Sequence, residues 1–282
     1  MTMKKTITTA AMLALMLGAP VLQAADAPAT AEAQAKEFRD FTYKRFPDIK
    51  PADYIYGVYA LNEDYRSQFD AMNEFPPYDG AIAQGKELWT KPLANGKSLQ
   101  DCLGQAKGLR AMYPFFDSAT NKVRVLEADV IQCAQAYGDD KIKAKSKEIK
   151  NISAYLSSES RGLKVDVSVP NDKALAAFED GRTRFYQKTG QLNLSCADCH
   201  QYHSGQRARS ETLSPSIGKT AHFPSWRLKA DGLVPLHERL SGCVKDTRAK
   251  PYALYGSEFS NLEYFLAYID NGLVITGPAV RK

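Results

Sequence analysis

The chain lacks the compositional marks of a fibrous, disordered or membrane-spanning protein. Its 282 residues include only 18 glycines and 14 prolines, and 44% are hydrophobic, which excludes a collagen-like, coiled-coil or largely disordered chain. The formal net charge is only +5 and the basic residues are scattered, so the composition gives no strong support for nucleic-acid binding. Past residue 25 no stretch approaches the roughly 18 uninterrupted apolar residues of a membrane span.

The amino-terminal segment has the three parts of a secretory signal peptide. Lys4 and Lys5 precede a short apolar run over residues 10–22, and small residues follow. We predict that residues 1–24 are removed by cleavage after Ala24, with cleavage after Ala27 as the alternative. Export would place the mature protein in an oxidising compartment, in which disulfide bonds persist.

The rest of the chain repeats short motifs at a constant distance. Apolar residues recur with helical spacing in segments 148–156 and 258–266, at an offset of 110. Upstream, Cys102 falls opposite Cys196 at an offset of 94, which predicts a 16-residue insertion after the cysteine pair of the second copy. The pairs that match at the larger offset are Tyr113 with Phe223, Pro114 with Pro224, and Cys133 with Cys243.

These matches predict a mainly α-helical protein with two domains related by internal duplication. The first domain is predicted over residues 81–165 and the second over residues 171–282. Residues 25–80 form an N-terminal extension, which we interpret as a wrapping segment without assigned chemistry. A Val-rich link closed by Pro170 joins the two domains and is expected to be extended.

Cys196, Cys199 and His200 form a C-x-x-C-H motif. Two thiols at this spacing can add to the vinyl groups of one haem, and the adjacent histidine then becomes the proximal ligand of the iron. A zinc site would need a second ligand pair nearby, and a thioredoxin-type motif would need a β-α-β pattern; the sequence shows neither. The motif therefore predicts one covalently bound haem c in the second domain.

The sequence leaves the distal ligand of the iron open between histidine and cysteine. Once the signal peptide is removed, the remaining methionines are Met72 and Met112, and both lie outside the haem domain. His203 lies too close to the proximal histidine to reach the opposite face of the haem. The other candidates in this domain are His222, His237 and Cys243.

Among these candidates, Cys243 has the position in the sequence that is most typical of a distal ligand. It lies 43 positions after His200, a typical separation for a distal ligand, and it has no partner cysteine left in its domain. Arg239, one helical turn earlier, would favour the thiolate form. A thiolate ligand would lower the reduction potential of the iron, which would make the site a poor general electron acceptor.

The first domain keeps two cysteines, Cys102 and Cys133, but not the rest of the haem motif. It has no second motif cysteine and no proximal histidine, so it should not bind haem. Two remaining cysteines that flank the same pocket in an oxidising compartment should pair. We therefore predict a Cys102–Cys133 disulfide, with two free thiols as the alternative.

These residues resemble the SoxA family, the catalytic cytochrome c subunits of SoxAX complexes in periplasmic thiosulfate oxidation. The likeness covers nearly the whole mature chain. It is carried by the C-x-x-C-H motif, the Phe-Pro-Ser-Trp-Arg run at 223–227 and above all the Arg-Leu-Ser-Gly-Cys run at 239–243. Because the haem motif of the first domain is broken, the chain resembles the one-haem branch, in which the first-domain cysteines are expected to form a disulfide.

The resemblance implies a periplasmic L-cysteine S-thiosulfotransferase, which joins thiosulfate oxidatively to a cysteine of a SoxY-type carrier protein. A SoxX-type cytochrome c subunit would complete a heterodimer. Cys196 and Cys199 would attach the haem, with His200 and Cys243 as axial ligands of its iron. Cys243 would also be the catalytic cysteine, and Arg239 would bind the substrate, because a guanidinium suits a small dianion.

Two other classes of function are compatible with the sequence. One is a passive periplasmic c-type electron-transfer cytochrome with His222 or His237 as distal ligand, and the other is a haem-based sensor or binding subunit without turnover. Three basic residues of the inserted region, Arg207, Arg209 and Lys219, would help to steer an anion or a partner, although an ordinary solvated loop is the preferred interpretation.

Overall fold

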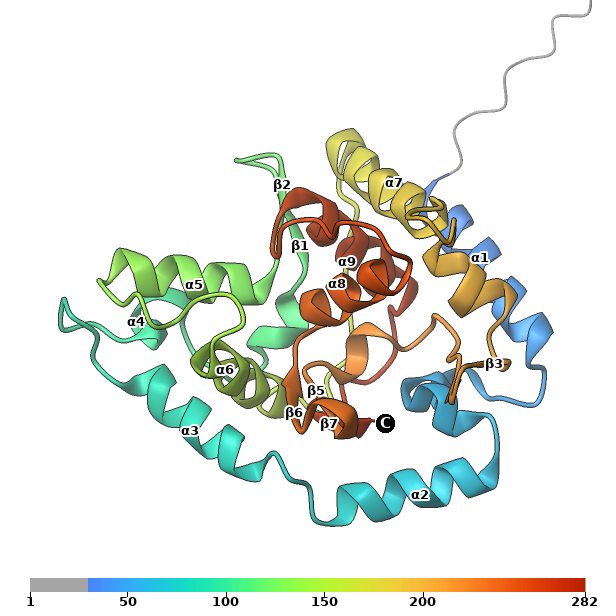
Figure 1. The fold of residues 1–282 in the computed structure, drawn as a ribbon. Helices are drawn as coiled ribbons and strands as arrows, with labels where there is room; N and C mark the ends of the chain where they lie inside the picture. The colour runs from blue at the N-terminus through green and yellow to red at the C-terminus, as the bar shows by residue number, and fades with distance from the viewer. Residues whose placement is uncertain (1–29, 282) are drawn as a thin grey trace, which may run out of the picture.

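The computed structural model describes residues 30–281, so the predicted signal peptide at 1–24 lies outside the described part of the chain. That part is mainly helical, as predicted (Figure 1). The α-helices are α1 (Ala31–Arg45), α2 (Glu63–Glu74), α3 (Asp79–Thr90), α4 (Leu99–Leu103), α5 (Leu126–Ala136), α6 (Lys147–Ser158), α7 (Asp172–Tyr186), α8 (Leu236–Asp246) and α9 (Ser257–Ile269). None of the helices within residues 30–281 is long and apolar enough to cross a membrane.

Short helices and strands connect these α-helices. The 3-10 helices are η1 (Pro51–Ala60), η2 (Leu109–Met112), η4 (Thr220–His222) and η5 (Leu228–Ala230), and η3 (Asp198–Tyr202) is a π-helical turn. The strands are β1 (Phe115–Asp117), β2 (Lys122–Arg124), β3 (Arg207–Ala208), β4 (Glu211–Thr212), β5 (Ser225–Arg227), β6 (Gly232–Val234) and β7 (Ala279–Arg281). They form two two-stranded sheets, β1-β2 and β3-β4, and one three-stranded sheet in the order β6-β5-β7.

A pair of crossing helices forms the core of each half of the molecule. We call residues 81–165 the first half, in which α3 packs on α6, and residues 171–281 the second half, in which α7 packs on α9. Each crossing depends on a glycine, because a Cβ atom at Gly85 would lie 2.1 Å from the carbonyl oxygen of Asn151, and one at Gly181 would lie 2.0 Å from that of Asn261. Glycine allows this close backbone approach at both crossings.

The connections between the crossing helices follow the same constant offset. The hairpins β1-β2 and β5-β6 lead directly into α5 and α8, and an antiparallel bridge joins Lys164 to Val274, which are themselves equivalent positions. The N–H of Val165 donates to the carbonyl of Leu273 at this bridge (2.9 Å). Because equivalent residues of the two halves pair with each other in antiparallel fashion, the halves are related by an approximate two-fold axis at this bridge. Internal duplication as its origin stays a prediction.

Capping boxes correct the register that was predicted for the cysteines. In the first half the N–H of Ser98 donates to the Asp101 carboxylate (2.7 Å), and the hydroxyl of Ser98 accepts from the N–H of Asp101 (3.3 Å). The same arrangement recurs in the second half at an offset of 97, between Ser195 and Asp198. This offset places Cys102 opposite Cys199, and not opposite Cys196 as predicted, because the capped turn and not the cysteine alone determines the register.

The segment before the first half packs mainly against the second half. Helix α1 lies beside α7 and α9 (Figure 1), and Phe38 contacts the rings of Phe185 and Phe265 at centroid distances of 5.3 and 5.6 Å. Helix η1 then passes over Gly218, whose added Cβ would lie 2.2 Å from the carbonyl oxygen of Tyr54. This extension therefore covers the half that carries the C-x-x-C-H motif.

Candidate functional site

The C-x-x-C-H motif lies in a capped turn at the start of η3. The hydroxyl of Ser195 accepts a hydrogen bond from the N–H of Asp198 (3.0 Å), and the Asp198 carboxylate accepts one from the N–H of Ser195 (2.8 Å). This box holds Cys196 and Cys199 on a single turn, and both are free thiols. The structure thus presents both motif thiols and His200 within one short helical segment.

The imidazole of His200 is oriented by a backbone carbonyl. Its Nδ1 lies 2.8 Å from the carbonyl oxygen of Ser214 and 3.1 Å from the Nζ of Lys219. The carbonyl can only accept, and Lys219 donates to the Ser214 hydroxyl, so we assign the proton to Nδ1, which leaves Nε2 as a base. Burial, together with the positive charge of Lys219, lowers the pKa of His200 to about 3. A neutral imidazole with its other nitrogen held by a carbonyl is the usual arrangement of a histidine that binds a metal.

Helix α8 brings Cys243 to the motif. Burial first, and then the nearby sulfur of Cys243, raises the pKa of Cys196 to about 12. The same sulfur contributes to the raised pKa of Cys199, again after burial. The three half-buried thiols of the second half therefore lie close together, although none of them forms a disulfide within the described chain.

Several positive charges surround Cys243. The pKa of Lys219 is lowered to about 7, mainly by burial. The Cys243 sulfur opposes this shift, whereas the charges of Arg239 and Arg227 add to it. Burial also lowers the pKa of Arg227, followed by the charge of Arg239. The positive charge of the buried Arg281 also contributes to the lowered pKa of Lys219. This arrangement can hold a small anion beside the thiol, because it concentrates guanidinium and ammonium groups where water is partly excluded.

The sequence patterns indicate only part of this cationic group. They assign a role to Arg239, and they name Lys219 with Arg207 and Arg209 as steering residues only in the less favoured interpretation of the inserted region. They give no role to Arg227 or Arg281. Arg227 ends the Phe-Pro-Ser-Trp-Arg run, so its position in that motif was an available signal. Arg281 reaches the site only because β7 pairs in parallel with β5, which no local pattern in the sequence indicates.

The candidate distal histidines differ in what their ring nitrogens already contact. His203 is exposed and its Nδ1 lies 3.1 Å from Gln206. His237 uses both nitrogens: its Nδ1 accepts from the N–H of Tyr255 (3.1 Å), and its Nε2 lies 2.8 Å from the Glu263 carboxylate. His222 is buried, with Nδ1 hydrogen-bonded to the carbonyl of Gly218 (3.0 Å). Release from these contacts would be required before His237 could bind iron.

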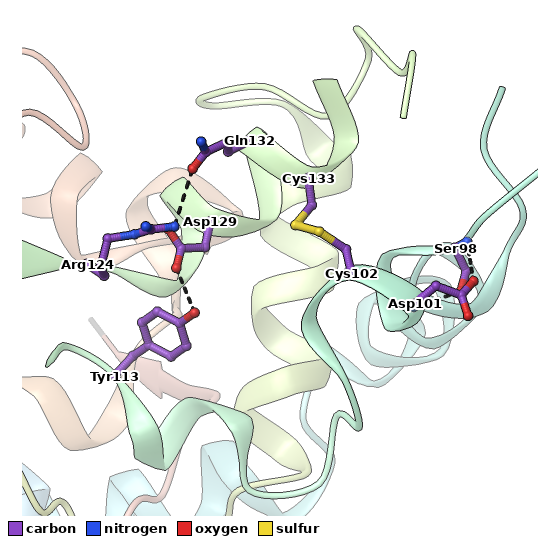
Figure 2. The surroundings of a disulfide bond; sticks show 8 residues. All are labelled: Ser98, Asp101, Cys102, Tyr113, Arg124, Asp129, Gln132 and Cys133. Atoms are coloured by element: carbon purple, nitrogen blue, oxygen red, sulfur yellow. Dashed lines mark hydrogen bonds and ion pairs between the residues drawn. A yellow bond between two sulfur atoms is a disulfide. The ribbon is translucent and has the colours of Figure 1, made fainter. Parts of the chain in front are cut away.

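The first half has a disulfide where the second half has free thiols. Cys102 and Cys133, the pair predicted to be bonded, are joined in the structure, and Figure 2 shows the bond between α4 and α5. Beside it the Asp129 carboxylate accepts from the hydroxyl of Tyr113 (2.7 Å) and binds Arg124 (2.7 Å). No charged side chain is left over in this group to attract an anion.

The residues of the second half fit a covalently attached haem c. Two free thiols stand at the spacing that the vinyl groups require, and an imidazole with an unprotonated Nε2 follows directly. Cys243 supplies a third sulfur close to both thiols. The capped turn, the oriented histidine and the glycine-dependent helix crossing define the protein as a c-type cytochrome.

Comparisons with known proteins identify the family. The family model for the SoxA/TsdA cytochrome c domain matches residues 84–165, which is the half without the C-x-x-C-H motif. The L-cysteine S-thiosulfotransferase subunit SoxA of Chlorobaculum thiosulfatiphilum is 42% identical over 271 residues, covering 96% of this chain and 95% of the relative. The SoxA subunit of Allochromatium vinosum is 39% identical, with 90% and 91% covered.

A solved structure agrees with this assignment. The crystal structure of SoxXA from P. pantotrophus superposes with a TM-score of 0.70 at 31% identity, covering 77% of this chain and 84% of that chain. The chain belongs to the SoxA family of L-cysteine S-thiosulfotransferase subunits.

Proposed function

We propose that this protein is the catalytic subunit of a periplasmic enzyme that joins thiosulfate to a cysteine of a carrier protein of the SoxY type. The observation that carries the proposal is the convergence of one free thiol, Cys243, with a haem-binding motif and a group of positive charges. A SoxX-type cytochrome c subunit is proposed as its partner in a heterodimer. The solved complex of a related SoxA with SoxX supports that pairing.

We propose one haem c, held by the second half alone. Cys196 and Cys199 would attach it, and His200 and Cys243 would be the axial ligands of its iron. When bound, haem c supplies a one-electron acceptor next to the reacting sulfur. The carbonyl of Ser214 keeps the proton of His200 on Nδ1 and so leaves Nε2 for the iron.

The substrate would bind through its negative charges. Thiosulfate is a small dianion, and Arg239 with Arg227 and Lys219 would hold it beside Cys243 and neutralise its charge. The Sγ of Cys243 and the sulfane sulfur of thiosulfate then form a disulfide bond. The thiolate and the dianion give up two electrons in this step. A haem c held by Cys196, Cys199 and His200 would supply one of the electron acceptors, and a haem of the SoxX-type partner would supply the other.

The second step transfers the group to the carrier. A thiolate of the carrier protein attacks the sulfane sulfur, the bond from this sulfur to Cys243 breaks, and the thiolate of Cys243 is regenerated. Arg239, one helical turn from Cys243, would hold the sulfonate group in place during the exchange.

Replacement of the proposed catalytic sulfur tests this function. Cys243→Ser should lower thiosulfate conjugation by about a thousandfold or more, because the nucleophile is lost. It should also change the low-spin haem spectrum and the EPR g-values. A matched control removes two other sulfurs, Cys102→Ser with Cys133→Ser, and should leave both readouts unchanged.

The passive electron carrier predicts the opposite result. In that case His222 or His237 binds the iron, and Cys243→Ser leaves the spectrum and electron transfer as they were. Intact mass of the purified protein then measures the number of haem groups. A mass that corresponds to two haems would contradict the proposal that the first half carries none.

A further inference from the structure

A group of polar side chains is buried where the two halves meet, beside the first turn of α8. We call it the inter-half cluster. Its members are electrostatically coupled. Burial raises the pKa of Tyr255, the charges of Glu127, Glu238 and Glu263 raise it further, and Arg110 opposes them. The cluster consists of Arg110, Glu127 and Lys150 from the first half, and His237, Glu238, Tyr255 and Glu263 from the second.

Within the second half, His237 connects α8 to α9. Its Nδ1 accepts from the N–H of Tyr255, so its Nε2 carries the proton and faces the buried Glu263 carboxylate of α9 at 2.8 Å. The ring of Tyr255 stacks on the imidazole at a centroid distance of 5.1 Å. The second residue of α8 is therefore held from two sides.

The next residue connects α8 to the other half of the molecule. The Oε2 of Glu238 lies 2.9 Å from the Nζ of Lys150, which belongs to α6 in the first half (Figure 1). The side chains are largely buried, with 13% of Glu238 and 24% of Lys150 exposed. This ion pair is consequently less screened than one at the surface.

Helix α8 has no side-chain cap that could fix its start. Its N-cap residue is Pro235, which makes no capping hydrogen bond. The first turn depends instead on His237 and Glu238, and Arg239 is the next residue along. Because successive helical residues point about 100° apart, any rotation of this turn moves Arg239 and then Cys243 relative to the haem motif.

Stability alone does not account for the inter-half cluster. Four of its atoms are fully buried and have no hydrogen-bond partner among residues 30–281: Nε of Arg110, Nε2 of His237, Oε1 of Glu238 and the hydroxyl of Tyr255. The Nε2 of His237 lies near the Glu263 carboxylate without the geometry of a hydrogen bond. Such unpaired groups cost stability, and buried ion pairs commonly add little of it. What a buried polar group supplies instead is a defined orientation of the element that carries it.

We propose that the inter-half cluster positions α8, with Lys150 of the first half acting on Arg239 and Cys243 through Glu238. Lys150 is a positioning residue in this arrangement and touches neither substrate nor haem. The inference rests on the proposed function for the effect on turnover, and on the proposed ligation of a haem iron by Cys243 for the spectral effect. It gives the half without the C-x-x-C-H motif a direct part in shaping the site of the other half.

Lys150→Met in the complete complex tests the proposal, because methionine keeps the length of the side chain and removes the charge. Turnover per folded haem should fall about tenfold through the misplaced Arg239. The EPR g-values that report Cys243 ligation should also shift. The exchanged pair, Lys150→Glu with Glu238→Lys, should restore at least half of the lost rate. Lys147→Met, exposed on the same helix, is the matched control and should change neither readout.

The outcomes separate positioning from a merely structural role. A lower yield of folded protein with unchanged g-values and unchanged rate per haem would overturn the proposal, as would a lost rate that the exchanged pair does not restore. Should Lys150→Met fail to fold, Glu238→Gln keeps the shape of its partner and is expected to give the same spectral shift. If the wild type shows no thiosulfate conjugation, the proposed function fails and the g-values alone decide on positioning.

Discussion

The two halves use one equivalent position for opposite purposes. Where the second half has Arg239, the first half has Asp129 at the equivalent position. Asp129 binds Arg124 and accepts from Tyr113, so its charge is satisfied locally (Figure 2). Arg239 instead adds to the positive charges around Cys243. A change of sign at one helical position thus separates a closed ion pair from a site that can bind an anion.

Sulfur shows the same contrast. Cys102 and Cys133 are bonded to each other, whereas their equivalents Cys199 and Cys243 are free. The fully buried Leu99 occupies the position that Cys196 has in the second half. The same scaffold therefore uses its sulfur for cross-linking in one half and leaves it available for chemistry in the other.

Removal of the cross-link should have the largest effect on stability. Cys102→Ser with Cys133→Ser opens a loop closed over a sequence separation of 31 residues, and chain entropy predicts a loss of about 4 kcal/mol. Guanidinium chloride unfolding measures it. The haem spectrum should stay the same, since the second half holds the motif. A changed spectrum in the folded double variant would show that the halves are not chemically separate.

The helix crossings test whether the halves are mechanically alike. Gly85→Ala and Gly181→Ala each place a Cβ about 2 Å from a backbone oxygen, so each should cost about 3 kcal/mol of unfolding free energy. Gly80→Ala is the control on α3, because nothing lies within 4 Å of its added Cβ. Thermal unfolding of the three variants compares them. A harmless substitution at either crossing would contradict the equivalence of the two pairs.

A smaller, pH-dependent difference should separate Asp270 from Ser160, its equivalent in the first half. Burial raises the pKa of Asp270 to about 6 from its usual 3.8, although Gly218 and Thr220 donate hydrogen bonds to it. Between about pH 4 and pH 6 the folded protein keeps a proton that the unfolded chain has lost. The stability that this carboxyl contributes is thus present below about pH 4 and is lost as the pH rises through 6.

Urea unfolding of the wild type and of Asp270→Asn measures this difference, because asparagine does not titrate. The advantage of the wild type over the variant should fall by about 2 to 3 kcal/mol between pH 4 and pH 7. Ser160→Ala is the control, and its effect should not depend on pH. An advantage of Asp270 that is constant over this range would refute the raised pKa.

The parts of the site that depend on covalent spacing could be predicted from the sequence. The C-x-x-C-H motif by itself predicts haem attachment. The constant offset between the repeated motifs is enough to identify Cys133 and Cys243 as equivalent positions. The mainly helical architecture followed from the apolar spacing of 148–156 and 258–266. The motif and the helical spacing are local, and the constant offset is found by comparing the sequence with itself, so each could be recognised without knowledge of the tertiary fold.

The remaining features depend on contacts between distant segments. The register of Cys102 was wrong because a capping box, and not the cysteine, aligns the halves. Arg281 was missed because only the parallel pairing of β7 with β5 brings it to the site. The Lys150–Glu238 pair joins residues 88 positions apart, and no local pattern connects them. Long-range packing determines such contacts, and a single sequence does not display it.

The docking of α1 has a consequence for the order in which the chain can fold. Arg39 donates to the carbonyl of Ile269 across 230 residues, and the hydroxyl of Tyr268 donates to Glu32 across 236. Helix α1 therefore cannot make all of its packing contacts until nearly the whole polypeptide has been synthesised. The docking of α1 is thus among the last long-range contacts that can form as the chain is synthesised from its N-terminus.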